Sequence, residues 1–258
     1  MLEVYWLEQT EADVPAENDW LSASETFRLN SMRFAKRRAD WRLGRWTAKR
    51  ALAISLNMPL QSEVLASVEI RSAQSGAPEV FFAGQPSSVT ISLSHRAGSA
   101  VCAVALAGAA LGCDLEKIEP RSEAFVADYF TTEEQAFVAR ATATDRFRRL
   151  ALIWSGKEST LKALHEGLRL DTRCVQVSAT DDDERRREGA REVDCLGKNA
   201  FDFPPSYGFN GWCPLQVRYS LGAVFSGWWQ QAGSFLRTLV AVPAPAPPIL
   251  LQTPPGDS

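Results

Sequence analysis

The chain has 258 residues, of which 45% are hydrophobic and 23% charged, and its net charge is −3. This length and composition allow one large or two small globular domains with a sizeable core and exclude a largely disordered or collagen-like chain. The near balance of charge excludes a globally basic nucleic-acid coat, and five cysteines without a C-x-x-C pair favour a reducing compartment.

The sequence shows no membrane or export signal. Its longest apolar run, residues 99–112, is shorter than the roughly 20 residues that a membrane-spanning helix needs. Residues 1–10 hold acids and no basic segment, which disfavours a secretory signal. We therefore expect a cytoplasmic protein that does not bind membranes.

The first 50 residues change sharply in charge. Residues 1–27 hold seven acids and no Lys or Arg, whereas residues 28–50 hold nine basic residues against Asp40 alone. The second segment lacks proline and predicts a helix. On that helix a basic stripe, defined as Arg38, Arg42, Arg45 and Lys49, shares one face. The pattern fits two roles equally, pairing with the acidic segment or binding phosphates.

Short strands separated by Gly, Pro and Ser clusters are predicted next, at residues 64–70, 80–82, 89–93, 100–106 and 111–118. The capping box T-T-E-E at 131–134 predicts the start of one helix, and a longer helix should cover about 145–166. Strands resume at 174–177, 215–221, 223–229 and 235–242. Residues 181–191 form a charged loop, and the proline-rich tail 243–258 should be extended or disordered. Two subdomains of similar plan fit this order.

Asp114 and Glu116 are the first candidate site. Two apart on a strand, they project from the same face and repel each other unless a cation lies between them. Mg²⁺ prefers a few carboxylate oxygens and completes its shell with waters and substrate phosphates, so the pair suits a phosphate enzyme. Acids also alternate on most amphipathic strands with an exposed face, so the pair alone is weak evidence and its spacing favours a solvated face.

Two further clusters carry suitable chemistry. In W-S-G-K-E-S-T-L-K at 154–162, Glu158 and Lys162 are one helical turn apart. They form either a surface ion pair or, because Trp154 and its apolar neighbours bury one side, a carboxylate and a cation that face a phosphate. S-L-S-H-R at 92–96 supplies hydroxyl, imidazole and guanidinium groups, all of which donate hydrogen bonds to phosphates.

Together, S-x-S-H at 92–95, G-C-D-L-E at 112–116 and W-S-G-K-E-S-x-x-K at 154–162 resemble, in this order, the motifs of the Sfp-type 4'-phosphopantetheinyl transferases. The resemblance runs from about residue 33 to about 170 and includes G-R-x-x-x-K-R-A-L at 44–52. It implies an α/β (α+β) fold of two similar subdomains in a pseudo-twofold arrangement, each a small sheet packed on a long helix. The subdomains would be 1–106 and 107–242, with the active site in the cleft between them.

The resemblance also implies the activity. A monomeric, Mg²⁺-dependent enzyme would transfer the 4'-phosphopantetheine arm of coenzyme A (CoA) to a serine of an apo acyl or peptidyl carrier protein and release 3',5'-ADP. Such enzymes serve fatty-acid, polyketide or nonribosomal-peptide synthesis. The carrier would dock either on the basic face or on hydrophobic residues that follow Pro120, namely Phe125, Tyr129 and Phe130.

Residue by residue, the resemblance implies three metal carboxylates, Asp114, Glu116 and Glu158. Lys162 and Lys157 would contact CoA phosphates, and Lys162 and Glu158 would be catalytic. The general base would be Glu158 or a metal-bound water that it orients. The CoA 3'-phosphate would lie at Ser94 and His95, with Arg42, Arg45 and Lys49 nearest in the basic stripe and Asp114 also in the CoA site. Where the family often has G-K-P, this chain has Gly76-Ala77-Pro78, so Arg71 or Arg96 would have to replace the lysine.

Two other functions are compatible with the same residues. A non-catalytic module would bind RNA or another polyanion through residues 28–50, but three acids beside the phosphates disfavour it, and we expect no nucleic-acid partner. A Mg²⁺-dependent nuclease or phosphatase would share the carboxylates and would hydrolyse CoA without a carrier.

Overall fold

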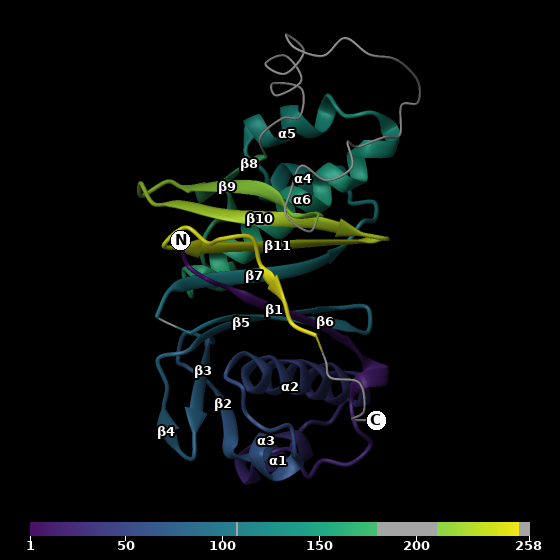
Figure 1. The fold of residues 1–258 in the computed structure, drawn as a ribbon. Helices are drawn as coiled ribbons and strands as arrows, with labels where there is room; N and C mark the ends of the chain where they lie inside the picture. The colour runs from purple at the N-terminus through teal and green to yellow at the C-terminus, as the bar shows by residue number, and fades with distance from the viewer. Residues whose placement is uncertain (107, 180–210, 253–258) are drawn as a thin grey trace, which may run out of the picture.

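The computed structural model describes residues 1–106, 108–179 and 211–252. Figure 1 shows the elements in layers: helix α6 (Ala143–Ala163) covers one sheet, a second sheet packs beneath it, and helix α2 (Ala35–Ser55) covers the far side. The expected mixed α/β fold is therefore confirmed. The predicted loop 181–191 and residues 253–258 of the predicted tail lie outside the described residues.

The sheet of the amino-terminal half has the strand order β12-β1-β6-β5. Its strands are β1 (Tyr5–Thr10), β5 (Thr90–Arg96), β6 (Ser99–Ala105) and β12 (Ile249–Leu250). Strand β1 pairs antiparallel with β6 and parallel with β12. The predicted tail is thus extended at β12, where it pairs with β1. Strand β1 itself was not predicted from the sequence.

Helix α2 packs on this sheet through Ala48, Ala51 and Leu52, which join a buried cluster with Leu7 and Ile91. The single helix predicted over 28–50 is wrong, because α1 (Ala23–Asn30) ends before α2 begins. A capping box of Ser22 and Glu25 starts α1. The break allows α1 to fold back, so that its Leu29 reaches a buried cluster with Trp46 of α2.

A third, small sheet lies beside α2 in the order β2-β3-β4. Its strands are β2 (Val68–Ser72), β3 (Pro78–Phe82) and β4 (Gln85–Pro86). The strand predicted at 64–70 is wrong in its first half, because α3 (Ser62–Ser67) is helical. That turn of helix buries Leu65 against the α1–α2 cluster, which a strand at the same place would not do.

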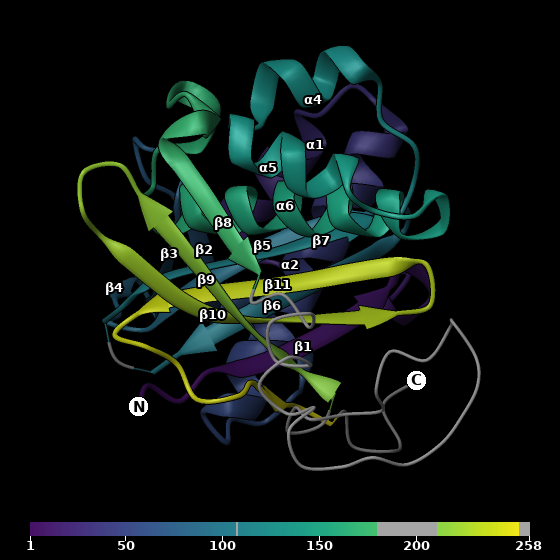
Figure 2. The ribbon, with the colours of Figure 1, turned by 90° about the horizontal axis from the view of Figure 1, so that it is seen from above.

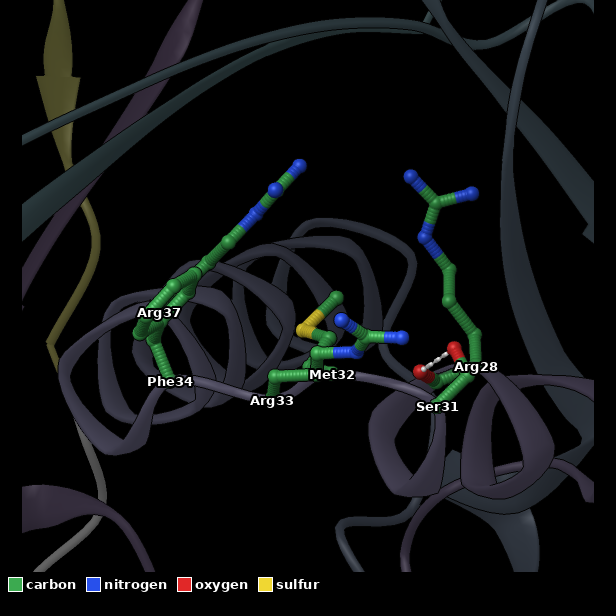
Figure 3. A pocket seen from close by; sticks show the side chains of 6 residues that line it. All are labelled: Arg28, Ser31, Met32, Arg33, Phe34 and Arg37. Atoms are coloured by element: carbon green, nitrogen blue, oxygen red, sulfur yellow. Dashed lines mark hydrogen bonds between the residues drawn. The ribbon is translucent and has the colours of Figure 1, made fainter.

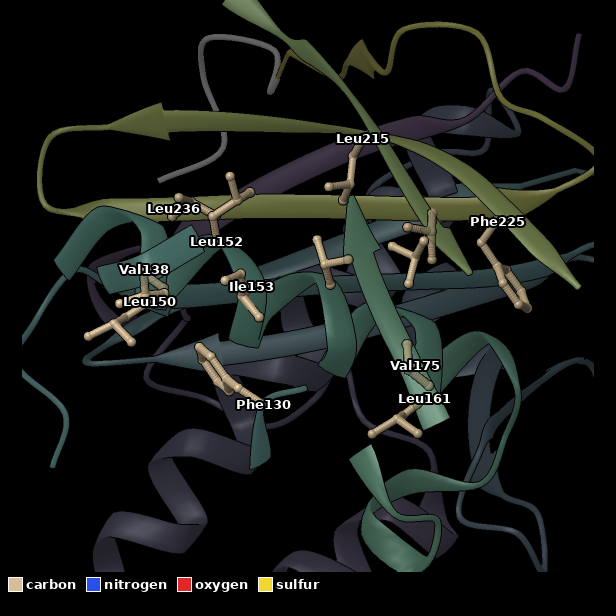
Figure 4. Packing of buried hydrophobic residues seen from close by; sticks show 14 of the residues in the cluster. Phe130, Val138, Leu150, Leu152, Ile153, Leu161, Val175, Leu215, Phe225 and Leu236 are labelled. Carbon is tan, nitrogen blue, oxygen red and sulfur yellow. The ribbon is translucent and has the colours of Figure 1, made fainter. Parts of the chain in front are cut away.

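The sheet of the carboxy-terminal half has five antiparallel strands in the order β7-β11-β10-β9-β8. They are β7 (Ala110–Lys117), β8 (Val175–Ala179), β9 (Cys213–Tyr219), β10 (Val224–Ala232) and β11 (Phe235–Val242). Helix α6 lies across this sheet, and Figure 4 shows Leu150, Ile153 and Leu161 of α6 in the shared core with Leu215 and Leu236.

Two short helices, α4 (Glu123–Tyr129) and α5 (Thr132–Ala139), precede α6. The predicted capping box is confirmed: the Thr131 side chain accepts from the Glu134 amide, and the Glu134 carboxylate accepts from the Thr131 amide. Helix α6 ends at Ala163, earlier than predicted, and His165 beyond it has a φ of 59°. Single turns of 3-10 helix occur at Glu11–Asp13, Gly167–Arg169 and Thr172–Cys174.

The two larger sheets pack face to face. Leu111, Cys113 and Leu115 of β7 share a buried cluster with Trp6 and Val101 of the first sheet. Figure 2 shows, from above, the strands of the two sheets stacked between α6 and α2. Within the described ranges no helix is long and apolar enough to cross a membrane.

Candidate active site

Strand β7 separates two environments. Its odd-numbered residues face the first sheet. Because successive side chains of a strand alternate, Gly112, Asp114 and Glu116 lie on the opposite face of β7. Gly112 lies so close to α6 that a Cβ atom there would stand 1.7 Å from the Ser159 carbonyl oxygen. A glycine is therefore required at this position, and it brings the β7 carboxylates close to the last turns of α6.

Asp114 and Lys162 form the centre of the site. Lys162 Nζ lies 2.8 Å from Asp114 Oδ1 and donates a second hydrogen bond, of 3.0 Å, to the Cys113 carbonyl. The hydroxyl of Ser94 donates to the same Asp114 Oδ1 at 2.8 Å. Asp114 is only 5% exposed, and its other oxygen, Oδ2, is buried without a hydrogen-bond partner among the described residues.

Lys162 is a cation at neutral pH. Burial lowers its pKa, but the negative charge of Asp114 and the hydrogen bond to it outweigh this effect, so the pKa of Lys162 lies above its ordinary value. A permanent positive charge is thus held next to Asp114.

Glu116 is 7% exposed and is held by two guanidinium groups. Its Oε1 lies 3.2 Å from Arg96 Nε and 3.0 Å from Arg121 Nη2, and it also accepts from the Lys117 amide at 3.0 Å. Burial raises the pKa of Glu116, and the charge of Asp114 raises it further. The two carboxylates are therefore close enough to repel each other.

Glu158 lies one helical turn before Lys162 on α6 and is partly buried. Burial raises its pKa, and the charges of Asp114 and Glu116 add to that effect against the opposing charge of Lys162. All three predicted carboxylates thus share one electrostatic environment. Within the described residues, however, no three His, Cys, Asp or Glu side chains form a group ready to hold a metal ion.

His95 follows Ser94 at the end of β5 and faces the start of α2. Its side chain is 54% exposed, and Nε2 lies 4.0 Å from Asp40 Oδ2. Asp40 is also paired with Lys36 at 2.7 Å. Partial burial lowers the pKa of His95. Ser94 and His95, predicted together at the 3'-phosphate, are used differently here, since the Ser94 hydroxyl points to Asp114.

Lys157 does not join this site, which corrects the expectation that it contacts CoA. It is 0% exposed, lies 2.8 Å from Glu134 Oε2 on α5, and donates to the carbonyls of Thr172 and Val175. The reason is helical geometry: at about 100° per residue, position 157 points some 140° away from position 162. Lys157 therefore fastens α6 to α5 and β8.

The three stripe residues assigned to CoA also have internal partners. Arg42 donates to the backbone carbonyls of Pro15 and Ala16, and Lys49 Nζ lies 2.6 Å from Glu25 Oε2. Arg45 Nε lies 3.6 Å from the other oxygen of Glu25. These contacts favour the first of the two roles left open, because Arg45 and Lys49 pair with Glu25 and Arg42 binds main-chain carbonyls of the acidic segment. The assignment of Arg42, Arg45 and Lys49 to CoA stays a prediction, which these internal contacts disfavour.

A different part of the same basic segment faces solvent. Arg28, Arg33 and Arg37 line a pocket where α1 meets α2, together with Ser31, Met32 and Phe34 (Figure 3). From the sequence, these arginines belong to the basic run but have no predicted role. A single helix over 28–50 would have no corner between α1 and α2, and the pocket lies at that corner. The sequence likewise gave no role to Arg121, only the capping box to Glu134, and only phosphate binding to Arg96.

Residues 110–203, a little over a third of the chain, match the family model described as the 4'-phosphopantetheinyl transferase superfamily. This segment is therefore similar to that superfamily. The matched range contains β7 and α6, and hence Asp114, Glu116, Glu158 and Lys162, while Ser94 and His95 precede it.

Two solved structures are similar to parts of the chain. A holo-(acyl-carrier-protein) synthase from Bacillus anthracis, in complex with CoA (3',5'-ADP), has 20% identity and a TM-score of 0.35 over 42% of this chain and 96% of its own. The holo-[acyl-carrier-protein] synthase of Thermotoga maritima has 22% identity and a TM-score of 0.32 over 50% of this chain and 75% of its own. Scores this low carry no argument about the chain. No curated protein matches it.

Proposed function

We propose that this chain is an Sfp-type transferase that moves the 4'-phosphopantetheine arm of CoA to a serine of an apo carrier protein and releases 3',5'-ADP. The observation that carries the proposal is the contact between Asp114 and Lys162 inside the superfamily domain. It joins the strand motif G-C-D-L-E to the helix motif W-S-G-K-E-S-x-x-K at one point, where a carboxylate and a cation meet. We further propose that the enzyme is a cytoplasmic monomer, which the mass of the protein in solution would test.

The residues present fit a Mg²⁺ ion. A buried carboxylate oxygen without a partner, as at Asp114 Oδ2, costs about 1–3 kcal/mol unless something binds it. Mg²⁺ is commonly bound by one or two carboxylates and completes its shell with waters and substrate phosphates, so a closed set of three ligands is not needed. Asp114 and Glu116 would hold the ion, with Glu158 beside them. When bound, Mg²⁺ would neutralise charge on the CoA pyrophosphate.

The chemistry proposed for the chain's own residues is one of positioning and charge. The serine oxygen of the carrier would form a bond to the phosphorus atom that carries the pantetheine arm, and the bond from that phosphorus to the leaving 3',5'-ADP would break. Lys162 would stabilise negative charge on the pyrophosphate. Glu158, directly or through one water, would take the serine proton.

CoA has a second phosphate group, the 3'-phosphate, which we propose to lie at the end of β5. His95 supports this placement, because it is half exposed beside the first turns of α2. Since Arg42, Arg45 and Lys49 have internal partners, the exposed basic residues at the start of α2 and in the pocket, namely Lys36, Arg38 and the pocket arginines, are the better candidates for this phosphate. Arg28, Arg33 and Arg37 supply guanidinium groups suited to phosphate.

We propose that the carrier docks near α4. Phe125 and Tyr129 pack edge-to-face against Trp154, with ring centroids 4.9 and 5.2 Å from that of the tryptophan, and Tyr129 is exposed. Phe130 is not available for docking, because it is 1% exposed and belongs to the core. Aromatic residues with one exposed edge are typical of interface hot spots.

The experiment that tests the function is the intact mass of candidate apo carrier proteins after incubation with the chain, CoA and Mg²⁺. The expected result is a gain of one phosphopantetheine arm on the carrier and the appearance of 3',5'-ADP. A parallel reaction without carrier is the control, since cleavage of CoA there would instead indicate a Mg²⁺-dependent hydrolase. No gain on any carrier, with CoA intact, would contradict the proposal.

A further inference from the structure

Strand β5 contacts strand β7 through every second side chain. Ser92 Oγ accepts from the Cys113 amide at 2.9 Å, and Ser94 Oγ donates to Asp114 at 2.8 Å. Two residues further on, Arg96 Nε lies 3.2 Å from Glu116 Oε1. Alternate residues of a strand share one face, so the three contacts form a row between the edge strands of the two sheets.

In this row, one carboxylate oxygen of Asp114 and one of Glu116 take all of the contacts described here, and the second oxygen of each takes none of them. At Asp114, both Ser94 and Lys162 reach Oδ1, while Oδ2 is buried and has no partner among the described residues. At Glu116, both guanidinium groups and the Lys117 amide reach Oε1, so Oε2 is the oxygen that remains. Each carboxylate thus has a defined oxygen for a cation.

Arg96 is itself held in place. Its Nη2 donates to Glu119 Oε1 at 2.5 Å while its Nε reaches Glu116, so the guanidinium bridges two carboxylates. Arg121 approaches the same Glu116 oxygen from the other side. A planar guanidinium with two anionic partners has little freedom to turn, and the carboxylate it binds is oriented with it.

Arg96 can act on Glu116 in two ways, through its charge or through its position. A guanidinium 3.2 Å from a carboxylate repels any metal ion that approaches that carboxylate. If Arg96 were merely a neutralising charge, it would weaken the metal site. If it orients Glu116, it would strengthen the site despite its charge. The two roles therefore predict opposite effects of removing it.

We propose that Ser94 and Arg96 are positioning residues, which select the oxygens that Asp114 and Glu116 present to a divalent cation. Neither side chain touches the reacting atoms. The inference rests on the proposed function only in that a cation binds at these carboxylates. It assigns to the β5 row a role separate from binding the 3'-phosphate.

The test is a calorimetric titration of the metal-free chain with Mn²⁺, without CoA and without carrier. Removing groups that orient metal ligands typically costs 10- to 100-fold in affinity. We expect Arg96→Gln to weaken Mn²⁺ binding at least about 10-fold, although the variant loses a positive charge, and we expect Arg96→Lys to recover part of the loss. A matched control is Arg146→Gln, which removes another arginine paired with a glutamate, at 2.7 Å, near the other end of α6.

Ser94→Ala is the second variant, because it removes the hydrogen bond to Asp114 without changing the net charge. We expect it to weaken Mn²⁺ binding as well, and thermal melts in EDTA identify any variant that does not fold. If Arg96→Gln is unfolded, Ser94→Ala decides. Binding as tight as wild type, or tighter, in either folded variant would overturn the inference, as would a wild-type chain that binds no Mn²⁺. The carrier-labelling experiment decides the proposed function independently of these titrations.

Discussion

Asp114 and Lys162 are 48 residues apart in the chain and meet at 2.8 Å. Asp114 comes from an edge strand and Lys162 from the last turn of the helix that crosses the same sheet. An ion pair on the surface would contribute at most about 1 kcal/mol to stability. Here the aspartate is buried and one of its oxygens has no partner in the part of the chain that the structure describes, so the pair is better understood as part of a binding site than as a stabilising contact.

Changing Asp114 should therefore affect activity far more than folding. Asp114→Asn keeps the shape of the side chain and removes its charge. We expect kcat/KM for carrier labelling to fall at least 100-fold, which corresponds to about 3 kcal/mol of transition-state stabilisation, while circular dichroism shows an intact fold. Asp19→Asn, an exposed aspartate of the amino-terminal segment, is the control. Near wild-type turnover in Asp114→Asn would remove Asp114 from the site.

Removing divalent metal should abolish labelling. Without a cation, the charges of Asp114, Glu116 and Glu158 would repel both one another and the pyrophosphate of CoA. Labelling rates measured after treatment with EDTA and after re-addition of Mg²⁺ check this expectation. Full-rate labelling in EDTA would show that the carboxylates act without a metal.

Glu158→Gln should raise stability while it lowers activity. The pKa of Glu158 in the folded chain lies above its ordinary 4.5, so the folded state binds more protons than the unfolded state between these two values, and stability falls as the pH rises through this window. The metal-free variant lacks this ionisation, so its Tm should exceed that of wild type at neutral pH. The advantage should disappear below pH 4.5.

Thermal melts of metal-free protein across pH 4 to 8, with Glu3→Gln as an exposed control, measure the effect. A Tm for Glu158→Gln that is below wild type at neutral pH would contradict the electrostatic argument.

Lys157 should prove structural. Lys157→Met removes one partner of a buried ion pair with Glu134, which typically costs about 3–5 kcal/mol because the other charge stays buried. Urea unfolding measures the loss. The double variant Lys157→Met with Glu134→Gln should recover part of it, because glutamine carries no charge yet retains an oxygen that can accept one of the two amides, of Thr131 and Val177, that the Glu134 carboxylate now binds. Under assay conditions in which the Lys157→Met variant is folded, its KM for CoA should match that of wild type.

Lys49 and Arg37 belong to the same basic segment and should respond in opposite ways. Lys49→Met breaks a buried contact with Glu25, so it should lower stability by about 3 kcal/mol and leave the KM for CoA unchanged relative to that for 3'-dephospho-CoA. Arg37→Gln alters an exposed pocket residue, so it should preserve stability and raise the KM for CoA more than that for the dephospho form. Equal KM values for the two substrates in wild type would contradict a 3'-phosphate site.

Local signals in the sequence predicted their elements well. The capping box at Thr131 depends only on residues three positions apart, and it begins α5 as expected. Strand β1 was missed, because its identity as a strand depends on pairing with β6, some 90 residues away. The break between α1 and α2 was missed for a similar reason. No proline or glycine marks it in the sequence, and its effect is to let Leu29 pack in one buried cluster with Trp46.

The same distinction holds for the site. Spacing within β7 and α6 predicted that Asp114 and Glu116 share a face and that Glu158 and Lys162 lie one turn apart. Whether a lysine faces a phosphate or the core depends on what packs against its helix, and the sequence around Lys157 does not reveal that Glu134 of another helix lies 2.8 Å away. The role of Arg96 likewise appears only when β5 lies beside β7.

At Gly112 the distance between β7 and α6 is set by contact between their main chains. Because a Cβ there would collide with the backbone of Ser159, strand and helix are in direct contact at this point, with no side chain between them to repack. Side chains at positions 114, 158 and 162 can then be exchanged without altering the distance between the two elements that carry them. The chain thus offers protein engineers a scaffold on which other pairs of reactive groups can be installed at a known spacing.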